Sequence, residues 1–150
     1  MEKGRLNSVL SGVAGEYLVA GELSRHGFLA AITLRNAKGV DIIATNSTAT
    51  RSVAVQVKTR YSRGRFWVLN EKAEKNYSKN LFYVFVSLNF GKPADFHIAP
   101  SKVVAETIKK HNRKWLRTLG KKGQKRNQTS MRTFHDDAGK FLNRWDILGL

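Results

Sequence analysis

The sequence predicts a single domain of the α/β class, in which helices flank a mixed central β-sheet. Its 150 residues are an ordinary length for one domain, and 41% of them are hydrophobic. A helical pattern comes first, strand-length runs of β-branched and aromatic residues follow, and a second helical pattern comes after them. This order is typical of a sheet between layers of helices.

The first expected helix covers residues 6–25, with Asn7 or Ser8 placed to cap its start and Gly27 after its end. Its apolar or small stripe comprises Val9, Gly12, Val13, Val19, Ala20 and Leu23. Glu16 projects into the middle of this stripe, so an acid is expected to face the core. A buried carboxylate must be protonated, paired or bound to metal. Pairing with Lys or Arg at a partly open helix edge is the simpler alternative.

Five runs rich in β-branched and aromatic residues are predicted to be strands. They cover residues 28–34, 40–45, 53–59, 81–88 and 95–99. Within the fourth run, residues 81–86 are apolar on both faces, which predicts a central strand that is covered on both sides. A short helical or irregular piece is expected near residues 71–79.

The second helix is expected to begin at Ser101. Residues 109–127 then hold nine Lys or Arg and no acid, and Gly120 and Gly123 interrupt them. We therefore expect this basic segment to be exposed and mobile. Apolar spacing returns over residues 134–150, which predicts a C-terminal segment docked on the core.

The charge balance indicates a polyanionic partner. The chain has 27 Lys and Arg against 11 Asp and Glu, a net charge of +16 that exceeds what solubility requires. The excess indicates non-specific attraction and does not separate DNA, RNA and anionic lipid. No apolar run is long enough to span a membrane, and residues 1–6 lack the apolar part of a signal peptide, so a cytoplasmic protein is predicted. The absence of Cys excludes sulfur-ligated zinc.

Several other motifs are interpreted as structural. The four histidines lack metal-binding spacing, so each is interpreted as a surface or capping residue. Asp136 and Asp137 are interpreted as a helix start after Thr133. The chain has no glycine-rich loop of a nucleotide-binding kind.

Three polar positions carry the strongest chemical signal. Asp41 interrupts an apolar run after a turn at residues 36–39, where a turn residue that bonds its own backbone is the simpler interpretation. Gln56 and Lys58 alternate with valines and share one strand face, as they also would on a solvated edge strand. Antiparallel pairing would bring Asp41 beside both, and the first helix would lay Glu16 across the same end. Such a set suits phosphodiester hydrolysis, because oxygen ligands hold a hard cation and an ammonium group orients water or stabilises charge.

These residues resemble the signature of the PD-(D/E)XK nuclease superfamily. Its E, D and (D/E/Q)xK elements are similar to Gly15-Glu16-Tyr17, Gly39-Val40-Asp41-Ile42-Ile43 and Gln56-Val57-Lys58. The resemblance covers about the first 90 residues and is greatest to Holliday-junction resolvases and Mrr-like restriction endonucleases. It implies a restriction-endonuclease-like αβββαβ core and DNA cleavage that depends on Mg²⁺, for which Mn²⁺ can substitute.

The resemblance also implies roles for the four residues. Asp41 is the principal metal ligand, Gln56 occupies the place of a second acidic ligand, Glu16 matches the helix glutamate, and Lys58 is the catalytic lysine. Val40 stands where the motif has proline, which is a minor variation. A neutral amide at Gln56 supplies less charge, which favours one tightly held ion over two. Two alternatives stay open: an inactive DNA-binding module with this fold, and a basic RNA-associated protein in which Glu16 and Lys58 pair.

Basic residues in two places are expected to contact DNA phosphates. They are Arg60, Arg63, Arg65, Lys121, Lys122, Lys125 and Arg126. In the loop that contains the first three, Tyr61 or Trp67 is placed to stack on an unpaired base. The alternative is a solvated hairpin with Phe66 and Trp67 in the core.

A two-fold dimer would suit cleavage of both DNA strands. Large apolar side chains could contribute to its interface, namely Phe82, Phe85 or Trp145. Placement of these three residues in the core explains them equally well.

Overall fold

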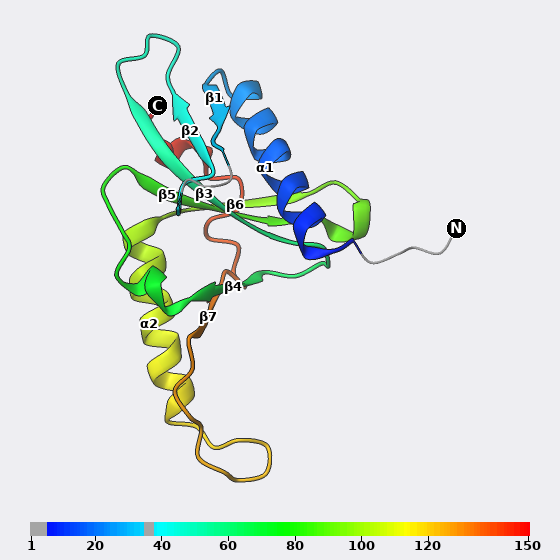
Figure 1. The fold of residues 1–150 in the computed structure, drawn as a ribbon, viewed down its shortest axis with the longest axis vertical. Helices are drawn as coiled ribbons and strands as arrows, with labels where there is room; N and C mark the ends of the chain where they lie inside the picture. Colours follow the sequence, from blue (N-terminus) through cyan, green and yellow to red (C-terminus); the bar gives the residue numbers. More distant parts are fainter. Residues whose placement is uncertain (1–5, 35–37) are drawn as a thin grey trace.

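The computed structural model describes residues 6–34 and 38–150, which form an α/β domain around a five-stranded sheet (Figure 1). Most of the N-terminal stretch at residues 1–6 and half of the turn expected at 36–39 therefore lie outside the described residues. Within the described ranges, no helix has the length and apolar character that a membrane span requires.

All five predicted strands are present in this sheet. They are β1 (Leu29–Ile32), β2 (Ile42–Thr45), β3 (Ser52–Arg60), β5 (Leu81–Ser87) and β6 (Asp95–Pro100). The spatial order is β1-β2-β3-β5-β6, in which β3 and β5 are parallel and the other pairs are antiparallel. Every residue of β5 is buried between β3 and β6, which confirms the prediction of a doubly covered interior strand.

A second, two-stranded sheet was not predicted. It pairs β4 (Phe66–Asn70) with β7 (Met131–His135) in antiparallel register. The 3-10 turn Glu71–Glu74 follows β4, at the place of the expected irregular piece. Each strand has five residues, and about 60 residues of sequence separate them, so neither carries a local hairpin signal. The pairing arises because the alternate residues of both strands pack toward the second helix.

Two core clusters cover the two faces of the main sheet. Helix α1 (Ser8–Arg25) contributes Val19 and Leu23 to one cluster, and Trp145 and Leu148 of the C-terminal segment are buried in the same cluster. Helix α2 (Ser101–Leu116) packs Val104, Ala105 and Ile108 on the opposite side, where β4 and β7 also lie (Figure 1). The sheet is therefore enclosed between α1 and the layer formed by α2, β4 and β7.

The ends of α1 agree with the sequence, but its buried face is different. Asn7 caps the helix by accepting a hydrogen bond from the Leu10 N–H, and Gly27 follows it with φ of +84°. The buried residues are Ser11, Gly15, Val19 and Leu23, whereas Val9 is 58% exposed. Glu16 consequently lies half-buried at the side of the contact face and not in its middle. Gly15 faces Thr59 of β3, where no larger side chain fits, so close approach as well as apolar content determines which face is buried.

The structure places two further regions of the chain. Residues 109–116 continue α2, so the basic segment outside regular structure begins after Leu116. Phe82, Phe85 and Trp145 are all buried in the core and are not free to form a dimer interface. Their apolar character serves packing within one chain.

Asp136 does not begin a helix, and His97 is not a surface residue. Both are almost fully buried, and His97 Nδ1 lies 2.6 Å from Asp136 Oδ2. The same carboxylate accepts hydrogen bonds from the backbone N–H groups of Lys140 and Phe141. Asp136 therefore anchors the turn after β7 to β6, a long-range role that local spacing does not reveal.

Candidate active site

Asp41 occupies the point at which the pairing of β2 with β3 ends. Its backbone N–H donates to Val55 O at 2.9 Å, and its Oδ2 accepts from the Val57 N–H at 2.7 Å. The side chain thus takes the place of the next backbone acceptor along the edge of β3. Asp41 is half-buried, and it bonds the neighbouring strand rather than its own turn. Its carboxylate is therefore fixed beside β3, just before β2 begins, and lies between the two faces of the sheet.

Gln56 and Lys58 lie on the face of β3 that is opposite α1. Val55 and Val57 pack in the cluster with α1, so the alternating residues point to the other side. There Gln56 and Lys58 line a pocket of about 260 Å³ together with Tyr83. Among the residues that the structure describes, Lys58 forms no ion pair. Its ammonium group is consequently available in this pocket.

Glu16 and Asp41 line a second pocket, of about 270 Å³, on the α1 side of the sheet. Thr33 also lines it, and its Oγ1 donates to Val40 O at 2.7 Å, which ties the chain before Asp41 to the end of β1. The four predicted site residues therefore lie around one edge of β3 but in two pockets: Glu16 and Asp41 line one, and Gln56 and Lys58 line the other. Asp41 connects them through its bond to Val57, which stands between Gln56 and Lys58 in the sequence.

Tyr83 belongs to this neighbourhood although the sequence did not single it out. It is paired in register with Gln56 across the parallel strands β3 and β5, and it is only 1% exposed. Burial and the negative charge of Asp41 both raise the pKa of Tyr83, so its phenol keeps its proton at neutral pH. The run that contains Tyr83 is apolar on both faces, and only the register with β3 reveals the connection.

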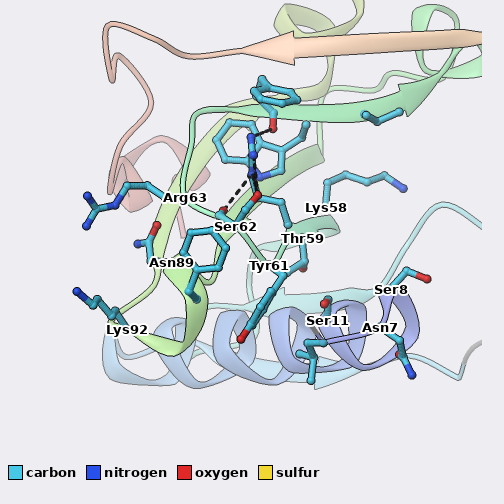
Figure 2. Close-up of a pocket in the computed structure, with 16 residues that line it drawn as sticks. Asn7, Ser8, Ser11, Lys58, Thr59, Tyr61, Ser62, Arg63, Asn89 and Lys92 are labelled. Carbon is cyan, nitrogen blue, oxygen red and sulfur yellow. Dashed lines mark hydrogen bonds between the residues drawn. The ribbon is translucent and has the colours of Figure 1, made fainter. Parts of the chain in front are cut away.

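A large cleft opens beside this edge (Figure 2). It has a volume of about 1220 Å³ and lies between the start of α1, the end of β3 with the loop into β4, and residues 89–92. Lys58 lines both the cleft and the pocket that contains Gln56. The described lining residues include four cations and no acid: the cations are Lys58, Arg60, Arg63 and Lys92. The described lining of the cleft is therefore positively charged around Lys58, an environment that favours anionic groups.

Two solved structures resemble this architecture along nearly the whole chain. The Holliday junction resolvase Hjc of Archaeoglobus fulgidus matches with a TM-score of 0.54 and 13% identity, over 92% of this chain and 95% of the resolvase. The bacterial homing endonuclease I-Ssp6803I matches with a TM-score of 0.58 and 11% identity, over 95% of this chain and 91% of the endonuclease. This chain has the fold of the PD-(D/E)XK nucleases. No protein-family model and no curated protein matches it.

Within this nuclease fold, the three arginines after Lys58 have different environments. Arg60 holds its own loop: Nη1 donates to Phe66 O at 2.9 Å, and the guanidinium lies 4.1 Å from the centre of the Phe66 ring. Burial lowers the pKa of Arg60 from its usual value. Arg65 donates to Asp137 O at 2.8 Å and does not line the cleft, whereas Arg63 is exposed and lines it. Of the three, Arg63 is the best placed for a phosphate in the cleft.

Trp67 is not placed for base stacking. It is 2% exposed, and its Nε1–H donates to Val86 O at 2.9 Å. Tyr61 is half-buried and lines the cleft, so it keeps that expected role as a candidate. The alternative interpretation, with Trp67 in the core, is correct for this residue.

The second basic group lies elsewhere on the nuclease fold. Lys121, Lys122 and Lys125 are exposed in the loop that follows α2, at the end of the helix remote from the main sheet (Figure 1). Arg126 stacks on the Trp115 ring at 4.5 Å and donates to Leu119 O at 3.2 Å. This basic loop, residues 117–130, is therefore separate from the cleft.

The donor chemistry at the edge of β3 fits a hard divalent cation. Asp41 and Glu16 offer carboxylate oxygens, and Gln56 offers an amide oxygen, which are ligand types that Mg²⁺ prefers. In the described ranges, no three or more His, Cys, Asp or Glu side chains gather into a metal cluster. This agrees with the replacement of an acid by Gln56, which leaves two carboxylates in the set.

Proposed function

We propose that this chain is a metal-dependent endonuclease that hydrolyses phosphodiester bonds in DNA. The observation that carries the proposal is the position of Asp41. Its carboxylate is fixed by the Val57 N–H at the edge of β3, in one pocket with Glu16 and next to the strand residues Gln56 and Lys58. The nuclease fold of the structural neighbours supports the same conclusion.

In this proposal Asp41 is the principal ligand of a Mg²⁺ ion, which Mn²⁺ can replace, and Glu16 and Gln56 provide further oxygen ligands. When bound, the ion supplies Lewis-acid chemistry, because it polarises the phosphate and makes water acidic enough to attack it. Two carboxylates and one amide favour a single tightly held ion.

Lys58 provides the positive charge on the side of the cleft. Its ammonium group forms no ion pair with other described residues, so it is free to orient a water molecule or to stabilise charge on the phosphate in the transition state. Arg63 and Lys92 line the same cleft and would hold the DNA backbone. DNA binding is thus assigned to Arg63 and Lys92 and part of the chemistry to Lys58, and all three residues line the same cleft.

The direct test is the cleavage specificity of the wild-type protein. Supercoiled plasmid, a linear duplex, a synthetic four-way junction and an RNA duplex of matched sequence are incubated with Mg²⁺, with Mn²⁺ or with EDTA. We expect cleavage of DNA with either metal and none in EDTA, and the preferred DNA form defines the substrate. DNA binding without cleavage in both metals would support an inactive binding module instead. Preferential attack on RNA would also contradict the proposal.

A further inference from the structure

We propose that the cleft of Figure 2 binds DNA that contains an unpaired base, and that this base stacks on the ring of Phe90. The inference deepens the proposed nuclease function by naming a class of substrate, and it rests on that function for the identity of the nucleic acid. Phe90 lines this cleft from the 3-10 turn Asn89–Gly91, and Asn89 and Lys92 line it as well.

The backbone conformation of Phe90 is energetically unfavourable, and packing of the fold does not account for it. Its backbone is left-handed, with φ of 59° and ψ of 39°, and Asn89 before it has φ of 49°. Asparagine tolerates this region, whereas a bulky aromatic residue rarely adopts it. The Phe90 side chain is also 55% exposed, so it gains little from burial. Strained residues of this kind cluster at ligand sites, where the surrounding structure holds them in place.

The surrounding structure does hold Phe90 firmly. Its backbone N–H donates to Tyr61 O at 3.0 Å, and its ring meets the Tyr61 ring edge to face at 5.7 Å. Tyr61 in turn packs against the core cluster. Asn89 fixes the other side of the loop, because its Nδ2 donates to Pro93 O at 2.9 Å and to Asp95 Oδ2 at 3.0 Å. Contacts with Tyr61 and with the loop at Asn89 therefore hold the Phe90 ring in a fixed position in the cleft lining.

The surroundings of the ring suit a nucleotide. Phe90 meets Tyr61 edge to face and is still 55% exposed, so it retains aromatic surface for a third ring. Arg63 and Lys92 line the same cleft and can bind the phosphates on either side of a stacked base. The bases inside a continuous duplex already have both faces stacked. Only a bulged, mismatched or single-stranded base can use the ring of Phe90, and this defines the substrate class.

A fluorescent base provides the test. Two DNA duplexes carry 2-aminopurine, one at a single-base bulge and one at a fully paired position, and both are titrated with the protein in EDTA. We expect binding to the bulged duplex to quench the 2-aminopurine. The Phe90→Leu variant, which keeps an apolar side chain but has no aromatic ring, should lose the quenching and bind the bulged duplex at least about 5-fold more weakly. Its affinity for the paired duplex should change less than about 2-fold.

Two further variants serve as controls. Phe90→Tyr restores an aromatic ring and should restore both the quenching and the affinity. Tyr77→Leu removes a half-exposed aromatic ring outside the cleft and should change neither. Equal quenching and affinity for wild type and Phe90→Leu would overturn the inference. Tighter binding of an RNA version of the bulged probe would overturn the assignment to DNA.

The outcome is independent of the test for cleavage. Quenching that depends on Phe90, in a protein that cleaves no DNA, would support the base-stacking site and reject the nuclease proposal. Metal-dependent cleavage without such quenching would reject the stacking site and leave the nuclease proposal intact.

Discussion

A Cβ atom added to Gly15 would lie 1.8 Å from the Oγ1 atom of Thr59. Helix α1 therefore contacts strand β3 through a bare backbone at this point, and no larger residue fits without movement of one element. Gly15 directly precedes Glu16, so the same contact sets how closely Glu16 approaches the edge of β3 that Asp41 occupies. The position of a candidate ligand thus depends on a residue with no side chain.

Gly15→Ala is expected to destabilise the protein although alanine favours helices. The added methyl group overpacks the contact with Thr59, at a cost of about 1–3 kcal/mol in the free energy of unfolding. Gly21→Ala is the matched control, because nothing lies within 4 Å of its added Cβ. That variant should gain about 0.5–1 kcal/mol from helix propensity. Urea unfolding compares the two, and equal stabilisation of both would contradict close packing at Gly15.

Lys58→Ala should slow DNA cleavage without loss of metal binding. If the ammonium group orients water or stabilises charge in the transition state, the catalytic rate falls by on the order of 10²-fold or more. Single-turnover kinetics at saturating DNA measure this rate. The control is Lys79→Ala, because Lys79 is exposed and lines neither the cleft nor the pocket that contains Gln56. A lower melting temperature with an unchanged rate would assign Lys58 a structural role.

Gln56→Glu should strengthen metal binding. A third carboxylate in the set adds negative charge beside the ion, so the metal dissociation constant should fall and cleavage should reach its maximum at lower Mg²⁺ concentration. Calorimetric titration of the metal-free protein with Mn²⁺ measures the first effect directly. If neither quantity changes, Gln56 does not contact the ion.

Local pattern predicted the elements of the main sheet because each strand carries its own apolar signal. Residues 81–86 show this most clearly, since a run that is apolar on both faces requires cover on both sides. Asp41, Gln56 and Lys58 could be selected for the same reason, because polar residues interrupt apolar strands there. Their grouping at one edge of β3 followed from hairpin pairing between neighbouring strands.

The remaining features depend on contacts between distant segments. β4 and β7 pair across about 60 residues, and His97 bonds Asp136 across 39 positions, so neither has a local signature. The buried face of α1 was predicted only in part: Val19 and Leu23 are buried as expected, but the small residues Ser11 and Gly15 are buried as well, which an apolar stripe does not capture. Tyr83 could be assigned to the site only from its parallel register with Gln56, which the sequence does not reveal.

The basic loop after α2 should contribute to DNA affinity and not to the rate of cleavage. Lys121, Lys122 and Lys125 are exposed on a loop apart from the cleft, so they can bind phosphates without approaching Asp41. Changing all three to Ala should make the slope of log affinity against log salt shallower by up to roughly 3, at about 0.9 per contact. The catalytic rate at saturating DNA should hardly change. An unchanged salt slope would place the loop away from DNA.

The most direct test of the central claim compares Asp41→Asn with wild type in a plasmid-nicking assay at saturating Mg²⁺. The amide keeps the size of the side chain but removes the charge of the principal proposed metal ligand. Asp137→Asn, at an exposed acid outside the site, controls for the loss of one negative charge. We predict that Asp41→Asn abolishes nicking while its DNA affinity in EDTA stays close to that of wild type. Nicking by Asp41→Asn at the wild-type rate would contradict the assignment of this edge as the catalytic centre.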